Sequence, residues 1–362
     1  MKIKDIELKH ISIPLTKTFK TALRTVDSAE NTVVMVHTDD GRTGFGEAPP
    51  TKAITGEDNE SIRKTIKEFI TPALIGQEVT DMDAVQEKLH GCIEGNNSAK
   101  AAVDMALYDL FTQEKGISLC EYLGGYRDKV ETDITISINE PEEMAADAAA
   151  AVKQGFSALK LKVGIDSEKD IQRVRAIREA VGKDMKIRLD ANQGWEVDEA
   201  IRTILKMEEL GFDIELVEQP VKARDFEGMK KVKDSVNTVI MADESCFTPE
   251  DARRLLEMNA ADVLNIKLMK CGGIYNALKI IEIAEEFGVE CMLGCMVESK
   301  ISLTAAAHLA AAKKTITRVD LDAAILLKED PVIGGFHKDI PWFSVDKTPG
   351  LGITGVNGLQ DI

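Results

Sequence analysis

The chain has 362 residues, a formal net charge of −17 at pH 7, 44% hydrophobic residues and 30% charged residues. This length is typical of about two domains, and the composition excludes intrinsic disorder of the whole chain. The negative charge disfavours nucleic acid and anionic membrane surfaces as partners, because both repel an acidic protein. No apolar stretch is long enough to cross a bilayer and no apolar h-region follows Met1, so we expect a cytoplasmic protein.

The cysteines form no Cys-x-x-Cys pair, and most of them lie in apolar runs. They are Cys92, Cys120, Cys246, Cys271, Cys291 and Cys295. We interpret them as reduced, small apolar residues of a cytosolic protein rather than as a zinc site or a disulfide framework.

The first third of the chain predicts strands followed by helices. Apolar and polar residues alternate over 3–15, and residues 32–38 and 42–47 flank Asp39-Asp40-Gly41, which is typical of a β-hairpin turn. Helical periodicity then covers three segments, 59–74, 81–90 and 98–114. This order indicates an α+β unit of moderate size.

From about residue 130, short β-branched runs alternate with single helices. The expected strands are 132–138, 158–163, 186–190, 214–218, 239–243, 263–268, 290–294 and 318–320. Successive strand ends are separated by the length of one strand, one helix and two loops, as in the 28 residues from Lys162 to Asp190. Eight such strands with right-handed crossovers favour a parallel α/β barrel. A doubly wound sheet is less favoured, because no Gly-x-Gly-x-x-Gly motif follows the first strand.

Several predicted strands end in a charged residue, although barrel strands are buried and should be apolar. The residues are Lys162, Asp190, Glu218, Asp243 and Lys267. Barrel chemistry lies at the C-terminal ends of the strands, so we expect these side chains around one mouth. Three carboxylates there would repel one another without a cation, and oxygen ligands indicate Mg²⁺, or Mn²⁺ as a substitute, rather than zinc. The alternative is solvated strand-end charge, which three acids at one level disfavour.

The lysines flank the carboxylates. Lys160 and Lys162 are two residues apart on a strand and therefore face the same way. Each disfavours protonation of the other and burial adds to this effect, so one of them can be a neutral base near pH 7. Lys267 comes from the sixth strand, across the barrel, and bases on opposite sides of a substrate suit a racemase or epimerase. The alternative, lysines that extend to solvent at a barrel rim, is disfavoured by the acidic trio.

Five motifs stand in order along the chain: Lys160-Leu161-Lys162, Asp190-Ala191-Asn192, Glu218-Gln219-Pro220, Ala242-Asp243-Glu244-Ser245 and the run Asn265 to Gly273. In this order and spacing they resemble the enolase superfamily, specifically its muconate-lactonizing-enzyme subgroup. The resemblance implies an α+β capping domain over 1–125, with a substrate-covering loop near 15–30. It also implies a modified TIM barrel, (β/α)7β, over 126–322 that holds the metal site, and a C-terminal segment over 323–362 that returns to the cap.

The resemblance further implies roles for single residues. Mg²⁺ ligands would be Asp190, Glu218 and Asp243. Lys162 and Lys267 would be the acid/base pair, and Lys160 would lie beside the substrate carboxylate. The metal and Lys160 would stabilise the enediolate that forms when an α-proton leaves the substrate. Further substrate contacts would come from Thr135, Asn192 and Met296.

The absence of a histidine at the end of the seventh strand argues against the mandelate-racemase pattern. His308 lies among alanines at helical spacing, so we interpret it as a packed helix histidine. Asp320 and Asp322 are two residues apart at the eighth strand and should point together into the mouth, where two carboxylates suit an ammonium group. This pair resembles that of dipeptide epimerases, which holds the substrate amine, and residues 294–299 resemble the same branch. Two exposed acids are the alternative.

Arg24 lies in a polar loop before the predicted hairpin. In the L-Ala-D/L-Glu branch of the resembled subgroup, an arginine in this loop accompanies an acidic substrate side chain. A surface arginine with no substrate contact is the alternative.

We therefore predict a Mg²⁺-dependent dipeptide epimerase that inverts the α-carbon of the C-terminal residue, with L-Ala-L/D-Glu or a related dipeptide as its small-molecule partner. o-Succinylbenzoate synthase, N-succinylamino-acid racemase and muconate-type cycloisomerase stay open on the same scaffold, although they leave Asp320 and Asp322 without a cationic partner. A non-catalytic barrel that binds a metal–carboxylate ligand and a Schiff-base aldolase are the alternatives of other classes. A homo-oligomer is open by analogy with other barrels.

Overall fold

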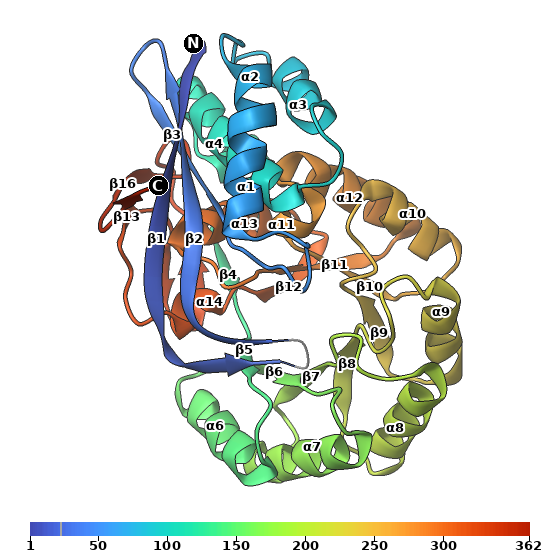
Figure 1. Ribbon diagram of the computed structural model, residues 1–362. Helices are drawn as coiled ribbons and strands as arrows, with labels where there is room; N and C mark the ends of the chain where they lie inside the picture. The colour runs from blue at the N-terminus through green and yellow to red at the C-terminus, as the bar shows by residue number, and fades with distance from the viewer. Residues whose placement is uncertain (22–23) are drawn as a thin grey trace.

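A long antiparallel hairpin begins the chain and forms the core of a capping domain. The computed structural model describes residues 1–21 and 24–362 (Figure 1). Its first sheet has the order β17-β1-β2-β3. The strands are β1 (Ile3–Lys20), β2 (Thr25–Thr38), β3 (Thr43–Ala48) and β17 (Gln360–Asp361). The alternation in β1 buries Ile11, Ile13 and Leu15, as a half-buried strand requires.

The helices of the capping domain cover one face of this sheet. They are α1 (Asn59–Thr65), the π-helical turn η1 (Ile66–Ile70), α2 (Thr71–Leu74), α3 (Met82–Gly91), α4 (Asn97–Lys115) and α5 (Leu119–Tyr122). The central helix, α4, packs directly on β3. A Cβ at Gly46 would lie 1.8 Å from the carbonyl oxygen of Ala102, so this close approach requires glycine.

Eight parallel strands form the nearly closed barrel that the strand spacing predicts, in the sheet order β12-β11-β10-β9-β8-β7-β6-β5. They are β5 (Ile134–Ile136), β6 (Ala158–Lys162), β7 (Lys186–Asp190), β8 (Ile214–Glu218), β9 (Val239–Ala242), β10 (Val263–Ile266), β11 (Glu290–Gly294) and β12 (Ile316–Asp320). The predicted fold class, a (β/α)7β barrel with an α+β capping domain, is confirmed.

Helices connect the barrel strands and surround them (Figure 1). They are α6 (Pro141–Lys153), α7 (Ser167–Val181), α8 (Val197–Glu209), α9 (Phe226–Ser235), α10 (Pro249–Glu257), α11 (Leu268–Cys271), α12 (Ile274–Phe287), α13 (Lys300–Ala312) and α14 (Ala323–Leu326). The side chains of Asp166 and Thr248 accept backbone hydrogen bonds at the starts of α7 and α10, which satisfies donors that have no partner within the helix. Within residues 1–21 and 24–362, no helix combines the length and apolar character needed to span a membrane.

Buried carboxylates of the capping domain contact the barrel and the last part of the chain. Asp104 of α4 accepts hydrogen bonds from the backbone N–H groups of Ile274 and Tyr275, at the start of α12. Asp109, further along α4, accepts from the N–H groups of Phe45 and Leu351. Both aspartates have no exposed surface. The domains are therefore joined by polar contacts as well as by apolar packing.

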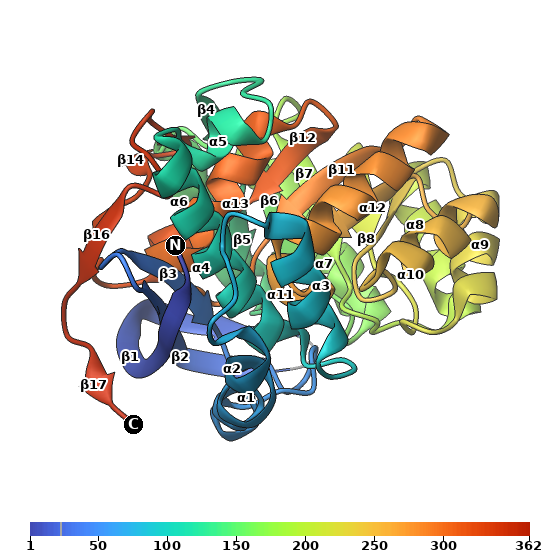
Figure 2. The same ribbon diagram turned by 90° about the horizontal axis from the view of Figure 1, so that it is seen from above.

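The segment after the barrel runs back along the capping domain. It contains β13 (Val332–Gly334), β14 (His337–Asp339), β15 (Trp342–Ser344), β16 (Ile353–Val356) and β17, and β15 pairs with β4 (Lys129–Glu131) ahead of the barrel. Figure 2 shows β17 beside β1, and the register pairs Lys9 with Asp361.

Residues 15–30 differ from the expected loop. β1 continues to Lys20 and β2 begins at Thr25, with a register shift between Pro14 and Phe19. The sequence alternation fades after Leu15, but cross-strand pairing of Phe19 with Val26 continues the hairpin beyond it. Residues 22–23, part of the predicted loop, lie outside the described residues. Both strands bend toward the barrel mouth (Figure 1), where the Lys20 N–H donates to the Ser137 hydroxyl at 3.2 Å.

Candidate active site

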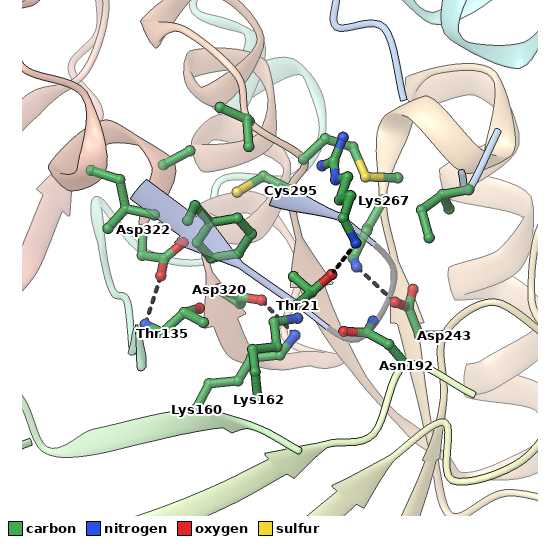
Figure 3. A pocket seen from close by; sticks show the side chains of 17 residues that line it. Thr21, Thr135, Lys160, Lys162, Asn192, Asp243, Lys267, Cys295, Asp320 and Asp322 are labelled. Carbon is green, nitrogen blue, oxygen red and sulfur yellow. Dashed lines mark hydrogen bonds and ion pairs between the residues drawn. The ribbon is translucent and has the colours of Figure 1, made fainter. Parts of the chain in front are cut away.

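The C-terminal ends of the barrel strands and the β1–β2 hairpin enclose one cavity. Phe19, Thr21 and Arg24 line it from the hairpin. From the barrel it is lined by Thr135, Lys160, Lys162, Asn192, Asp243, Lys267, Cys295, Met296, Val297, Asp320, Asp322, Ala323 and Leu326, and Ile54 of the cap completes it. Nine of the substrate-site and catalytic residues expected from the sequence therefore line a single cavity (Figure 3): Arg24, Thr135, Lys160, Lys162, Asn192, Lys267, Met296, Asp320 and Asp322.

The three predicted metal ligands converge. Asp190 ends β7, Glu218 ends β8 and Asp243 follows β9, and each is at most 1% exposed. One carboxylate oxygen from each lies within 4.8 Å of the other two. Burial and the charge of Asp190 raise the pKa of Glu218 to about 7. For Asp190, burial is outweighed by Lys162 and Lys160, which hold its pKa at about 2.

Each lysine of the site is paired with an acid. The Lys162 ammonium lies 2.5 Å from Oδ2 of Asp190, and that of Lys267 lies 2.7 Å from Oδ2 of Asp243. Lys162 and Lys267 enter the cavity from different sides in Figure 3. Burial lowers the pKa of Lys267, but Asp243 and the other acids together raise it by more, so this pKa lies above the usual lysine value.

Lys160 contacts three carboxylates of the site. Its ammonium lies 2.7 Å from Glu218, 2.8 Å from Asp320 and 3.2 Å from Asp190. Burial lowers the pKa of Lys160, but the three carboxylates outweigh it, and the pKa lies well above the usual value. Lys160 is therefore a buried cation.

The two aspartates at the eighth strand also face the cavity. Oδ2 of Asp322 accepts a hydrogen bond from the Thr135 N–H at 2.7 Å, and Oδ2 of Asp320 accepts from Lys160. Burial and the neighbouring charge of Asp320 raise the pKa of Asp322 to about 6. For Asp320, burial is outweighed by Lys160, which lowers its pKa. The pair therefore offers carboxylate oxygens to a cationic ligand group, beyond the acidic trio.

The remaining predicted residues lie around the same space. The Arg24 guanidinium forms no ion pair within residues 1–21 and 24–362, and burial lowers its pKa. The Met296 N–H donates to Oε1 of Glu298 at 2.7 Å. Nδ2 of Asn192 donates to Oε1 of Glu244 at 3.1 Å, and Asn192 has a backbone φ of +42°. The left-handed backbone lets Asn192 turn the chain directly after the Asp190 strand.

The donor set of the acidic trio fits a hard divalent cation. All three candidate ligand atoms are carboxylate oxygens. Among the described residues, three buried oxygens near the trio have no hydrogen-bond partner: Oδ1 of Asn192, Oε2 of Glu244 and Oδ1 of Asn265. Buried acceptors without donors are costly unless a cation or water approaches them. Mg²⁺ at Asp190, Glu218 and Asp243 is consistent with this surplus of acceptors.

Comparison with known proteins assigns this architecture to a protein family. Residues 5–124 match the family described as "Mandelate racemase / muconate lactonizing enzyme, N-terminal domain", and residues 143–356 match "Enolase C-terminal domain-like". The chain belongs to this family. The resemblance to the enolase superfamily and its muconate-lactonizing-enzyme subgroup is thereby confirmed.

Three members of the family illustrate the similarity. The L-Ala-D/L-Glu epimerase of Clostridium acetobutylicum is 54% identical, over 99% of this chain and 100% of that protein. The solved substrate-liganded complex of the L-Ala-D/L-Glu epimerase from Bacillus subtilis superposes with a TM-score of 0.97 at 52% identity, covering 98% of this chain and 99% of that one. The dipeptide epimerase from Enterococcus faecalis, solved with Mg and L-Leu-L-Tyr, gives 0.95 at 48% identity, over 98% and 100%.

Several site residues of this mandelate racemase/muconate lactonizing enzyme family member were not predicted from its sequence. Lys270 has no exposed surface and contacts Oδ1 of Asp243 at 2.6 Å. Asn265 donates to Oε1 of Glu218 at 2.8 Å, and Glu244 accepts from Asn192. All three stand inside the motifs that carried the resemblance, close to a predicted ligand or base. Their place within those motifs is the signal that could have identified them.

His308 is a structural residue. It is 2% exposed in α13, and its Nδ1 accepts a hydrogen bond from the Cys120 N–H at 3.0 Å. Burial lowers its pKa to about 4, so the ring is neutral at pH 7. The interpretation of His308 as a packed helix histidine is confirmed.

Proposed function

We propose that this protein is a Mg²⁺-dependent dipeptide epimerase that inverts the α-carbon of the C-terminal residue of L-Ala-L/D-Glu or a related dipeptide. One observation carries the proposal. Lys162 and Lys267 approach the acidic trio from different strands, and the Asp320–Asp322 pair lies in the same cavity. The names and bound dipeptides of the compared relatives support the same reaction. The enzyme class is isomerase. The six cysteines of the chain are free, which supports a cytoplasmic location.

The two-base reaction follows from the lysine positions. One lysine removes the α-proton of the C-terminal residue, and the other returns a proton to the opposite face of the carbon. Lys162 and Lys267 are the bases, and Lys160, a buried cation, stabilises the negative charge that develops on the substrate carboxylate. When bound at Asp190, Glu218 and Asp243, Mg²⁺, or Mn²⁺ in its place, supplies further positive charge as a Lewis acid.

The rest of the cavity binds the two ends of the dipeptide. Asp320 and Asp322 accept hydrogen bonds from the substrate ammonium, and the backbone N–H of Thr135 holds Asp322 in place. Asn192 and Met296 line the same cavity and contact the bound dipeptide in this proposal. The half-buried Arg24 guanidinium pairs with an acidic substrate side chain, which favours glutamate at the C-terminal position.

Deuterium exchange tests the proposal. Purified protein with Mg²⁺ in D₂O should invert L-Ala-L-Glu to a mixture of epimers with deuterium at the α-carbon, measured by NMR and chiral chromatography. N-succinylglutamate serves as the matched acidic compound without a free amine and should react poorly. Parallel reactions with Mn²⁺ test metal substitution. No α-exchange with any member of a library of dipeptides varied at both positions would refute the epimerase.

A further inference from the structure

Glu47 is a buried carboxylate of the capping domain that contacts the barrel. It lies in β3, has no exposed surface, and forms no ion pair within residues 1–21 and 24–362. Its Oε1 accepts hydrogen bonds from Nδ2 of Asn31 at 2.6 Å and from the Ser299 N–H at 2.9 Å. Its Oε2 accepts from the Ser299 hydroxyl at 2.8 Å and from the Ser302 N–H at 3.2 Å.

The donors from the barrel belong to the start of a helix. Ser299 is the N-cap residue of α13, and Ser302 lies in its first turn. Unpaired N–H groups and the helix dipole make this end of α13 favourable for an anion. Glu47 supplies that anion from a different domain, 252 residues earlier in the chain.

Asn31 extends the same contact toward the cavity. It lies in β2, is 1% exposed, and its Nδ2 donates to the Val297 carbonyl oxygen at 3.1 Å as well as to Glu47. Val297 lines the cavity together with Met296 and Cys295. The Asn31–Glu47 pair therefore holds residues 297 to 302, directly beside the substrate space.

A second buried carboxylate, that of Glu298, forms hydrogen bonds within the same part of the chain. Oε1 of Glu298 accepts from the Met296 N–H, and Oε2 of Glu298 accepts from the Ser302 hydroxyl. We call residues 295–299 the selectivity segment. The side chain of Glu298 ties this segment to itself at Met296 and to helix α13 at Ser302. The Asn31–Glu47 pair ties it to the capping domain. Because the cap also carries Arg24 and Phe19, one domain sets the distance between the two walls of the cavity.

We propose that Glu47 and Asn31 are positioning residues that set the dipeptide selectivity of the enzyme by fixing the selectivity segment against the capping domain. This inference rests on the proposed epimerase activity for its kinetic test only. Neither side chain is among those that line the cavity. Their effect is on where Cys295, Met296 and Val297 stand.

The test compares Glu47→Gln with Glu57→Gln. The glutamine at position 47 keeps the shape but removes the charge and one of the two accepting oxygens, so one barrel N–H loses its partner. Glu57 is a matched control, because it is also a buried cap glutamate that accepts two N–H groups at a helix start. Those N–H groups belong to Ser98 and Ala99 of the cap helix α4, so Glu57 does not contact the selectivity segment.

The kinetic readout is the ratio of kcat/KM for L-Ala-L-Glu to kcat/KM for L-Ala-L-Leu. This ratio is independent of the amount of folded enzyme, so a merely structural loss does not move it. Losing one charge-assisted hydrogen bond should change the ratio at least about threefold in Glu47→Gln, chiefly through KM, and leave it unchanged in Glu57→Gln. An unchanged ratio in both variants would overturn the proposal.

Hydrogen exchange provides a readout that needs no activity. Amides of residues 295–302 should exchange faster in Glu47→Gln, whereas residues 97–101 should do so in Glu57→Gln. If the wild-type protein epimerises no dipeptide, the proposed function fails, but exchange still decides whether Glu47 positions the segment. If Glu47→Gln does not fold, Asn31→Ala, which removes the contact with Val297, replaces it in both measurements. Unaltered exchange over 295–302 in the folded variant contradicts the proposal.

Discussion

The ammonium of Lys270 lies 2.6 Å from Oδ1 of Asp243, and the ammonium of Lys267 lies 2.7 Å from Oδ2 of the same carboxylate. The two cations are held differently. Lys270 also donates to the backbone carbonyls of Asp243, Cys246 and Asn265, whereas the Lys267 ammonium has only Asp243 among the described residues. Lys270 is therefore fixed and orients the carboxylate, while Lys267 can move toward a substrate carbon.

Replacing Lys270 by methionine should weaken metal binding and stability together. Three buried carbonyls and a buried carboxylate lose their donor, which should cost about 3–5 kcal/mol of the free energy of unfolding. We expect the dissociation constant for Mg²⁺, measured by calorimetric titration, to rise at least about tenfold as Asp243 loses its orientation. Lys206→Met is the control, since Lys206 pairs on the surface with Glu209 and should change stability by less than about 1 kcal/mol. Unchanged Mg²⁺ affinity in a folded Lys270→Met protein would argue against this role.

Replacing either of the two lysines proposed as bases should abolish proton exchange from a different epimer. Lys162→Ala and Lys267→Ala should each lower the rate of epimerisation by about 10²- to 10⁴-fold, because each inversion needs both bases. Each variant should retain α-deuterium exchange from one epimer only, and the two variants should retain it from different epimers. This retention is the internal control for an intact fold and metal site. Exchange of both epimers by either variant would contradict two-base catalysis.

The acids beyond the trio should govern recognition of the substrate amine. Asp322→Asn keeps an oxygen for the Thr135 N–H but removes a charge, so KM for L-Ala-L-Glu should rise about 10- to 100-fold. The N-acetylated dipeptide, which has no ammonium group, should be a poor substrate of the wild type. Its KM should rise much less than that of L-Ala-L-Glu when Asp322 is replaced. Steady-state kinetics on both compounds measure this difference. An equal rise in KM for the two compounds would assign Asp322 a structural role instead.

His308 should make stability depend on pH in a definite direction. Its pKa is about 4 in the folded protein against 6.5 for an unperturbed histidine, so between these values the unfolded state binds more protons. The contribution of neutral His308 to the free energy of unfolding is therefore complete above pH 6.5. It decreases as the pH falls toward 4, by at most about 3 kcal/mol.

Urea unfolding of the wild type and of His308→Asn at about pH 7.5, 6 and 5 measures this dependence. Asparagine can still accept the Cys120 N–H but has no proton to gain, so the difference in stability between the two proteins should shift in favour of the variant at low pH. If the difference in stability between the two proteins is the same at all three pH values, His308 is not the source of the pH dependence.

The barrel could be predicted because its signals are local. Each strand is a short buried run, and each charged residue that matters in the trio directly follows such a run, as Asp190 follows Leu189. Parallel strands place those ends at one level, so the sequence order alone brings Asp190, Glu218 and Asp243 together.

The rest depended on contacts that no local pattern contains. Glu47 reaches Ser299 across 252 positions, and nothing around either residue indicates the other. The ionisation of Lys160 likewise follows from three acids on three other strands, whose combined charge exceeds the effect of burial. The hairpin beyond Leu15 extends through backbone pairing, which tolerates a sequence without alternation.

Asp104 joins the cap to the barrel at the start of α12, with no exposed surface. Pulling the two domains apart would break the bonds between this carboxylate and the N–H groups of Ile274 and Tyr275, and would expose the apolar surface packed around them. The capping domain and the barrel should therefore melt as one cooperative unit, with a single calorimetric transition. The capping domain that covers the cavity is thus a permanent part of the molecule and unfolds only together with the barrel.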